Sequence, residues 1–510
     1  MTQGPRTRFS RMRLTLLKPA LAALLAGLLA LLLAGALPGS PATTAAADPA
    51  PADGPKLQRD GRYLVDEQGR LVIVHGLNFV WKKAPYAPPD TPNGFTSADA
   101  DWLYEHGFNG ARLGILWPGV NPTAPGVVDP AYFAKWDRVV DLMADKGIWM
   151  QFDMHQDMWH ETYGGEGVPN WAMKRPALFS LFPYPAVPFP FGYWTPEVST
   201  VFDNFWANKN NLLDHWVTFW KQVAAHYEDQ PYSMGYDLIN EPWAGLEWPT
   251  CIALAGCPLT YRKELQPAQD KALAGIRSVD PDGIVWYEPQ QLSSGLLLPT
   301  HLKGVAGEQN LGLSWHSYCS ATFAESTGLP LPLTETCKGF AKNRNKHAIE
   351  QAAEMNAVPL MSEWGATDNI RSLEIDADAA DVNTMSWLYW AYKYWNDPTT
   401  ADTKQGLFHD DADLTTTKDD KLRQLVRSYP QATAGRNLAY SYDVATGRFT
   451  MSFTGDASID APTRIFVSPI TAPNGYTVTA STGTVTKNGS YVDLATDTDG
   501  AVQITITPNP

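Results

Sequence analysis

Short apolar runs alternate with amphipathic stretches over most of the chain, from Leu71 to Ser428. Each run ends in polar residues, glycine or proline, which is typical of buried parallel strands. The stretches between the runs carry an apolar stripe and predict helices that cover a sheet. The predicted strands begin at Leu71, Gly110, Ile148, Met234, Gly283, Leu313, Val358 and Thr384.

Eight strands with helices between them predict a parallel sheet with right-handed crossovers. Eight is the number that closes into a (β/α)8 TIM barrel, so we expect an α/β barrel over residues 61–432. A doubly wound open sheet is the alternative arrangement of the same elements. The helices are expected at residues 96–106, 129–146, 211–229, 267–279, 343–357 and 419–428.

The composition changes after Ala434. Residues 436–510 are rich in Thr, Val, Ser and Gly, and polar and apolar positions alternate along them. Turn signals such as Asn474-Gly475 separate the short runs, which predicts a small all-β sandwich. Such a domain is either a structural appendage of the barrel or a carbohydrate- or lipid-binding module.

The N-terminus has the pattern of a secretory signal. Five basic residues precede an apolar run from Ala20 to Leu37, and Ala45-Ala46-Ala47 follows as a cleavage site. We therefore expect a signal peptide over 1–47 and a secreted, extracellular protein. An uncleaved anchor is the alternative, because the run is close to membrane-spanning length. Residues 48–60 are rich in Pro, Ala and Asp, which predicts a flexible segment.

The net charge and the number of cysteines limit the possible partners, cellular compartment and cofactors of the protein. The formal net charge is −15, which argues against nucleic acid and anionic membrane surfaces as partners. The four cysteines fit an oxidising compartment, and we favour the local pairs Cys251–Cys257 and Cys319–Cys337 among the three possible pairings. No metal site or cofactor is expected, because the sequence has no CxxC, HExxH or phosphate-binding glycine motif.

Two glutamates follow apolar runs at the ends of predicted strands. Glu241 lies in Asn240-Glu241-Pro242 after the fourth strand, and Glu363 precedes Trp364-Gly365 at the end of the seventh. In a (β/α)8 barrel, residues just past the strand ends line the active site, and strands four and seven face each other. Two carboxyls about 5–5.5 Å apart carry out retaining glycoside hydrolysis, one as acid/base and one as nucleophile.

Further polar and aromatic residues complete a set that resembles glycoside hydrolase family 5. Each of them alone has an ordinary explanation, such as a buried ion pair for an arginine or core packing for a histidine. The resemblance lies in finding all of them, in order, at successive strand ends. The set is Arg112, His155, Asn240, Glu241, His316, Tyr318, Glu363 and Trp390.

The resemblance implies a role for each of these residues. Glu241 would be the acid/base and Glu363 the nucleophile, while Asn240 would bind the 2-hydroxyl of the sugar. Tyr318 would hydrogen-bond the nucleophile. The other substrate-binding residues are implied to be Arg112 and His316, which would hold the nucleophile ionised and oriented, His155, and Trp390, which would lie beneath the sugar.

Within this family the chain is most similar to the endoglycoceramidases. The similarity rests on the sequences at 153–157, 164–171 and 202–206. It implies a secreted retaining endo-β-glycosidase that cuts between oligosaccharide and ceramide in glycosphingolipids. We expect the protein to be a monomer. The similarity also implies that Asp157 and a polar group from the loop after the first strand hold the glucose next to ceramide. Lys82 or Lys83 is the candidate for that group.

The stretch 175–193 interleaves aromatic residues with four prolines. Proline interrupts helices and sheets, so these aromatics cannot all belong to the core of a regular element. The stretch is either a loop packed on the barrel wall or an apolar surface that receives lipid chains, with transient membrane or micelle contact.

Two other functions remain compatible with the sequence. One is another family 5 β-glycosidase, either cellulase-like or a simple β-glucosidase. The other is a non-catalytic glycan- or lipid-binding barrel. The presence of both Glu241 and Glu363 argues against the second, because a binding protein needs neither carboxyl.

Overall fold

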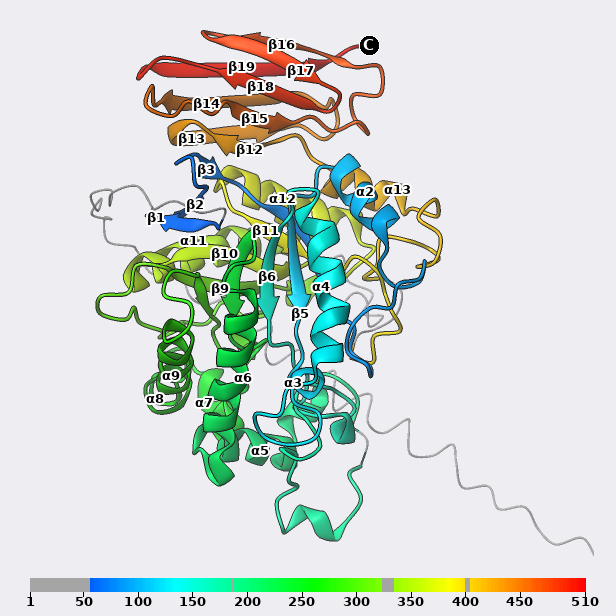
Figure 1. Cartoon of the computed structure of the whole chain (residues 1–510), viewed down its shortest axis with the longest axis vertical. Helices are drawn as coiled ribbons and strands as arrows, with labels where there is room; N and C mark the ends of the chain where they lie inside the picture. Colours follow the sequence, from blue (N-terminus) through cyan, green and yellow to red (C-terminus); the bar gives the residue numbers. More distant parts are fainter. Residues whose placement is uncertain (1–55, 186, 323–333, 400–403) are drawn as a thin grey trace, which may run out of the picture. The chain divides into compact units, whose positions relative to one another are not determined.

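The computed structural model describes residues 56–185, 187–322, 334–399 and 404–510 (Figure 1). Within them, eight parallel strands close into a barrel in which each strand pairs with its successor in the chain and the last pairs with the first. The barrel is the predicted (β/α)8 TIM barrel, and its closure excludes the doubly wound open sheet. Its strands are β4 (His75–Phe79), β5 (Gly110–Gly114), β6 (Trp149–Asp153), β7 (Ser233–Asp237), β8 (Val285–Tyr287), β9 (Leu311–Ser317), β10 (Val358–Trp364) and β11 (Trp387–Tyr389).

Helices lie between the barrel strands, as the amphipathic pattern predicts. Thr96 caps the first of them in a capping box with Asp99, and the Asp129 side chain accepts the backbone N–H of Ala131 at the start of another. The α-helices are α2 (Ser97–Glu105), α3 (Trp117–Val120), α4 (Pro130–Ala144), α5 (Pro196–Trp206), α6 (Leu212–Tyr227), α7 (Trp248–Cys251), α8 (Pro258–Thr260), α9 (Gln266–Arg277), α11 (Cys337–Met355), α12 (Ile370–Val382) and α13 (Asp419–Leu425). Every helix in the described ranges is too short or too polar to cross a bilayer.

Besides the barrel there are two antiparallel sheets, and their strands after β11 form the predicted all-β part. One has the strand order β1-β2-β3-β12-β15-β18-β17, and the other has the order β13-β14-β19-β16. Their strands are β1 (Gln58–Asp60), β2 (Tyr63–Val65), β3 (Leu71–Val72), β12 (Tyr429–Thr433), β13 (Gly435–Tyr442), β14 (Phe449–Gly455), β15 (Thr463–Phe466), β16 (Tyr476–Ala480), β17 (Thr484–Asn488), β18 (Tyr491–Ala495) and β19 (Ala501–Pro508).

The seven-stranded sheet is built from both ends of the chain, which the sequence did not predict. Val72 of β3 pairs with Ala432 of β12, so the single strand predicted over 71–78 is in fact two strands. The first belongs to this sheet and the second, β4, to the barrel. Backbone pairing with β2 also makes Gln58–Asp60 a strand, although we predicted these residues to be flexible. The predicted signal over 1–47 lies outside the described residues.

The seven-stranded sheet contacts the barrel at the amino ends of its strands. The ring of His75, the first residue of β4, stacks between Trp387 at 4.3 Å and Tyr429 at 3.7 Å. The Tyr429 hydroxyl donates to the carbonyl of Gly107, shortly before β5, at 2.7 Å. These contacts leave the carboxyl ends of the barrel strands free to form a site.

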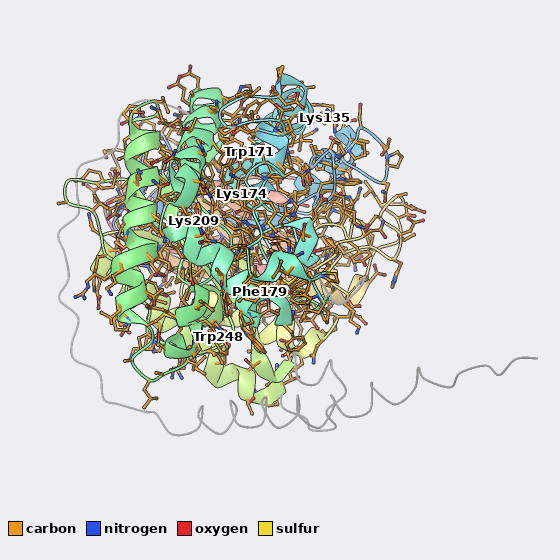
Figure 2. All side chains as sticks on the ribbon, turned by 90° about the horizontal axis from the view of Figure 1, so that it is seen from below. Lys135, Trp171, Lys174, Phe179, Lys209 and Trp248 are labelled. Atoms are coloured by element: carbon orange, nitrogen blue, oxygen red, sulfur yellow. A yellow bond between two sulfur atoms is a disulfide. The ribbon has the colours of Figure 1, made fainter. Side chains whose placement is uncertain are left out.

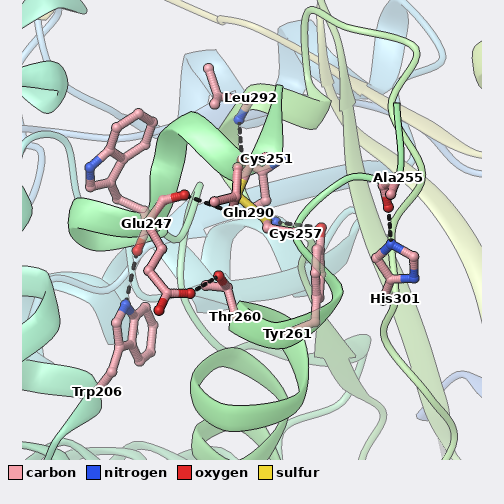
Figure 3. The surroundings of a disulfide bond; sticks show 12 residues. Trp206, Glu247, Cys251, Ala255, Cys257, Thr260, Tyr261, Gln290, Leu292 and His301 are labelled. Atoms are coloured by element: carbon pink, nitrogen blue, oxygen red, sulfur yellow. Dashed lines mark hydrogen bonds between the residues drawn. A yellow bond between two sulfur atoms is a disulfide. The ribbon is translucent and has the colours of Figure 1, made fainter. Parts of the chain in front are cut away.

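Two disulfides fix loops at those carboxyl ends. Cys251–Cys257 and Cys319–Cys337 are both formed, which confirms the two local pairings. Figure 3 shows the first disulfide close to Tyr261, whose hydroxyl accepts the backbone N–H of Gln290. The loop after β7 is thereby tied to the segment that follows β8.

Candidate active site

Glu241 and Glu363 meet at the carboxyl ends of β7 and β10, as predicted. One carboxylate oxygen of each and one ring nitrogen of His316 lie within 4.8 Å of one another. His316 Nδ1 is 2.9 Å from Glu241 Oε1 and 3.4 Å from Glu363 Oε2. Both glutamates are about 5% exposed. The barrel therefore places two buried carboxyls close enough to act on one bond.

Two donors orient the Glu363 carboxylate. Arg112 Nη1 donates to Oε1 at 2.5 Å, and the Tyr318 hydroxyl donates to Oε2 at 2.9 Å. Burial raises the pKa of Tyr318 well above its usual value, so its hydroxyl stays protonated and remains a donor. Glu363 is thus held in one orientation toward Glu241.

Arg112 is the centre of a buried ion network on β5. Its guanidinium lies 3.0 Å from Asp153 and 2.9 Å from Asp237, besides its contact with Glu363. Burial alone would lower the pKa of Arg112, but the carboxylates around it raise that pKa well above its usual value. The residue therefore carries a permanent positive charge beneath the site, and its Nη2 also donates to Oδ1 of Asn240 at 3.1 Å.

Glu241 lies in a different electrostatic environment. Burial, aided by the negative charge of Asp157, raises the pKa of Glu241 to about 7. The Ser294 hydroxyl donates to its Oε1 at 2.9 Å. Burial, with a further contribution from Arg112, lowers the pKa of His316 to about 3, so the ring next to Glu241 is neutral. The arrangement leaves Glu241 able to hold a proton near neutral pH.

The backbone at Glu241 is fixed from two sides. Its φ of 42° lies in the left-handed region, which a residue with a side chain adopts only when its surroundings impose it. The Gln156 amide donates to the carbonyls of Asn240 at 2.8 Å and Glu241 at 3.1 Å. On the other side, Glu288 Oε1 accepts the backbone N–H of Glu241 at 2.9 Å. These two supporting residues were not predicted, although Glu288 ends the fifth predicted strand and Gln156 lies inside the 153–157 motif.

A second cluster of predicted residues surrounds Lys82. Lys82 Nζ donates to Asp157 Oδ2 and Thr399 Oγ1, both at 2.6 Å, and lies 4.6 Å from the centre of the Trp390 ring. The His155 ring stacks on the Trp390 ring, with the ring centres 5.0 Å apart. Lys82 is 5% exposed, whereas Lys83 is exposed. Of the two candidate lysines, Lys82 is therefore the one that lies next to Asp157.

Charge compensation fixes the protonation of this cluster. Burial opposes the charge on Lys82, but Asp157, Asp397 and Glu166 raise its pKa well above the usual value. Burial likewise opposes the charge on Asp157, but Lys82 and His155 hold the pKa of Asp157 below its ordinary value. Burial raises the pKa of Glu166 well above its usual value. Lys82 and Asp157 are therefore a charged pair that can donate to and accept from sugar hydroxyls.

Both clusters contain carboxylate–histidine groups whose spacing is compatible with a metal ion. The first is His155, Asp157 and Glu166, and the second is Glu241, His316 and Glu363. A protein cation already lies against each of them. These cations are Lys82, 2.6 Å from Asp157, and Arg112, 2.5 Å from Glu363. Lys82 and Arg112 therefore supply, at each carboxylate group, the positive charge that a metal ion would otherwise bring.

The 175–193 loop is packed against the barrel at one end and exposed at its tip. At its end, Tyr193 is buried and its hydroxyl donates to Asp157 Oδ1 at 3.4 Å. At its tip, Leu178, Leu181 and Phe182 are 71%, 72% and 69% exposed. One end of the loop thus packs against the Lys82 cluster, while the tip projects into solvent.

Comparison with known proteins agrees with this geometry. Residues 65–396 match the model of the cellulase family (glycosyl hydrolase family 5), and residues 427–507 match the glycoside hydrolase family 5 C-terminal domain. The chain is 33% identical over 463 residues to Endoglycoceramidase I of Rhodococcus hoagii, and the match covers 88% of each protein.

Solved structures extend the comparison to three dimensions. The lactosyl-enzyme intermediate of Endo-glycoceramidase II from Rhodococcus sp. matches with a TM-score of 0.71 and 25% identity, covering 88% of this chain and all of that one. The ganglioside GM3 complex of the same protein gives a TM-score of 0.70 at 25% identity, covering 88% and 99%. The barrel, its paired glutamates and the extent of these matches lead to one conclusion: the chain is a glycoside hydrolase that belongs to glycosyl hydrolase family 5.

Proposed function

We propose that this chain is a retaining endoglycoceramidase, which hydrolyses the β-glycosidic bond between oligosaccharide and ceramide in glycosphingolipids. The observation that carries the proposal is the pair Glu241 and Glu363, of which one carboxylate oxygen of each lies within 4.8 Å of the other. That spacing suits direct attack by a carboxylate, since inverting enzymes keep their carboxyls about 6.5–9.5 Å apart. The similarity to Endoglycoceramidase I of Rhodococcus hoagii supports the lipid substrate.

The reaction proceeds in two displacements. Glu363 attacks the anomeric carbon while Glu241 gives its proton to the departing ceramide oxygen, which leaves a covalent glycosyl-enzyme and free ceramide. Glu241 then removes a proton from water, which attacks the same carbon and releases Glu363 and the oligosaccharide. The similarity to a lactosyl-enzyme intermediate structure supports this route.

The remaining site residues bind the sugar in this proposal. Asn240 is placed for the 2-hydroxyl, whose hydrogen bonds strengthen in the transition state. Trp390 and His155 provide an aromatic surface next to the scissile bond. The charged pair Lys82 and Asp157 holds hydroxyls of the same part of the head group.

Thin-layer chromatography of the products formed from a ganglioside in detergent tests this function. Intact oligosaccharide and free ceramide are the expected products. Stepwise loss of single sugars would instead indicate an exo-glycosidase. Turnover of an aryl cellobioside without any ganglioside cleavage would indicate a cellulase-like enzyme and exclude the lipid substrate. Activity in the culture medium would support secretion, which we infer from the pattern of residues 1–47.

The pH dependence should report the acid/base directly. Because Glu241 must be protonated to assist departure, and burial raises its pKa to about 7, activity should be present below pH 7 and decline above it. The expected decline is about tenfold per pH unit. The measurement is kcat/KM of an aryl cellobioside with a poor leaving group across this range. Glu241→Gln should remove the alkaline decline, and a wild-type profile that stays level well above pH 7 would contradict the assignment.

A further inference from the structure

Exposed apolar side chains are concentrated on two loops at the mouth of the barrel. One is the loop after β6, with Leu178, Leu181 and Phe182 at its tip, and the other follows β7. Of the ten large apolar side chains that are exposed in the described ranges, seven lie on these two loops. The four on the second loop are Leu246, Ile252, Leu254 and Leu259, with Leu254 80% exposed.

Aromatic contacts join the two loops into one surface. Trp194, just past the first tip, stacks on Trp248 of α7 with ring centres 6.0 Å apart. Trp248 in turn lies 5.9 Å from Trp243, which is 5.3 Å from Tyr193. Tyr193 and Trp243 are buried beneath this surface. Because the Tyr193 hydroxyl donates to Asp157, these buried rings connect the two loops to the sugar site. Figure 2 looks onto this end of the barrel, with Phe179 and Trp248 labelled.

Exposed basic side chains lie on both loops, although the chain as a whole is acidic. The net charge is −15, yet residues 172–196 contain Lys174 and Arg175 and no acidic residue. Residues 246–264 contain two exposed basic residues, Arg262 and Lys263, and two acidic residues. Glu247 accepts a hydrogen bond from Thr260, and burial raises the pKa of Glu264 to about 7.

Part of this positive charge stays available at the surface. Arg175 is paired with Glu197, but Lys174 is exposed. Lys209, which follows α5 and lies outside the two loops, is also exposed and donates to Asn204 Oδ1. Lys174 and Lys209, both labelled in Figure 2, line a cavity of about 200 Å³ together with Ala177, the residue before Leu178.

We propose that residues 174–182 and 246–263 form a docking surface for an anionic lipid surface. Leu178, Leu181, Phe182 and Leu254 enter the acyl boundary, while the lysines and arginines of the same loops meet negatively charged head groups. Docking in this way turns the mouth of the barrel, with Glu241 and Glu363, toward the membrane plane. The biological purpose of this docking rests on the proposed function, but the apolar and basic surface itself does not depend on the substrate.

Vesicle flotation tests the docking surface without any hydrolysis. The full chain is mixed with vesicles of phosphatidylcholine alone or of phosphatidylcholine with phosphatidylserine. The wild type should bind the anionic vesicles more tightly than the neutral ones, and the difference should shrink at high salt. A triple variant, Leu178→Ser with Leu181→Ser and Phe182→Ser, should bind the anionic vesicles about 100-fold more weakly.

Val382→Ser is the matched control, because Val382 is 81% exposed at the end of α12 and far along the chain from both loops. It should bind as the wild type does, and all proteins should hydrolyse a soluble aryl cellobioside equally. Unchanged binding of the triple variant, equal binding to both vesicles, or no binding at all would each overturn the proposal. Vesicle binding without ganglioside cleavage would support the docking surface and reject the proposed function instead.

Discussion

Glu363→Gln should abolish hydrolysis, with kcat lowered by about 10⁵-fold or more, as expected when a nucleophile is removed. The amide has nearly the same shape as the carboxylate, so it can still accept the hydrogen bond from Tyr318 at Oε. It cannot form a stable glycosyl ester, so neither displacement takes place. The measurement is the rate of aryl cellobioside and ganglioside hydrolysis by variant and wild type purified in parallel.

The control for this loss is Glu354→Gln. Glu354 lies on α11, and its side chain is 62% exposed in an ion pair with Lys303, so its replacement should leave kcat unchanged. A slow-reacting fluorinated glycoside should label the wild type on the peptide that contains Glu363 and should not label Glu363→Gln. Label on another residue, or substantial turnover by the variant, would refute the assignment of the nucleophile.

Arg112→Met should cause the largest loss of stability. The guanidinium lies 2.5–3.0 Å from Glu363, Asp153 and Asp237, and the arginine side chain is fully buried. Removing one partner leaves buried carboxylates without compensation, which costs about 3–5 kcal/mol in the free energy of unfolding. The midpoint of urea unfolding, followed by tryptophan fluorescence, measures the loss.

Arg371→Met provides the comparison. Arg371 pairs with Glu335 and Glu374 on the surface, where ion pairs contribute little because water and salt screen them. Its replacement should leave the unfolding midpoint nearly unchanged. Equal midpoints for the two variants would mean that the network around Arg112 does not hold the barrel together.

The sequence best predicted those site residues whose position follows directly from the order of the barrel strands. In a closed parallel barrel, a residue at the end of a strand faces the mouth wherever its strand lies. This is why Glu241 and Glu363 could be placed together from apolar runs alone, whereas Arg112 and His316 were assigned to the site by the family resemblance. Lys82 and Lys83 could not be separated in this way, because an irregular loop has no periodicity that tells which neighbour points inward.

Other features depend on partners distant in the chain. Gln156 and Glu288 support Glu241 only after three strands have closed around it. Helix α12 was not predicted, because its buried face includes Asp376 and Asp381, which read as solvent-exposed positions. Asp381 is tolerated there because Arg427 reaches it at 2.7 Å, a contact that no local pattern reveals.

The pairing of β3 with β12 sets an order on the synthesis of this protein. Val72 emerges from the ribosome early, but its partner Ala432 follows only after the last barrel strand has been translated. The seven-stranded sheet therefore cannot be completed before the barrel has been made. For the same reason, the C-terminal sheets cannot be transferred to another enzyme as a cassette unless residues 58–72 go with them, since β12 would otherwise present an open edge to other chains.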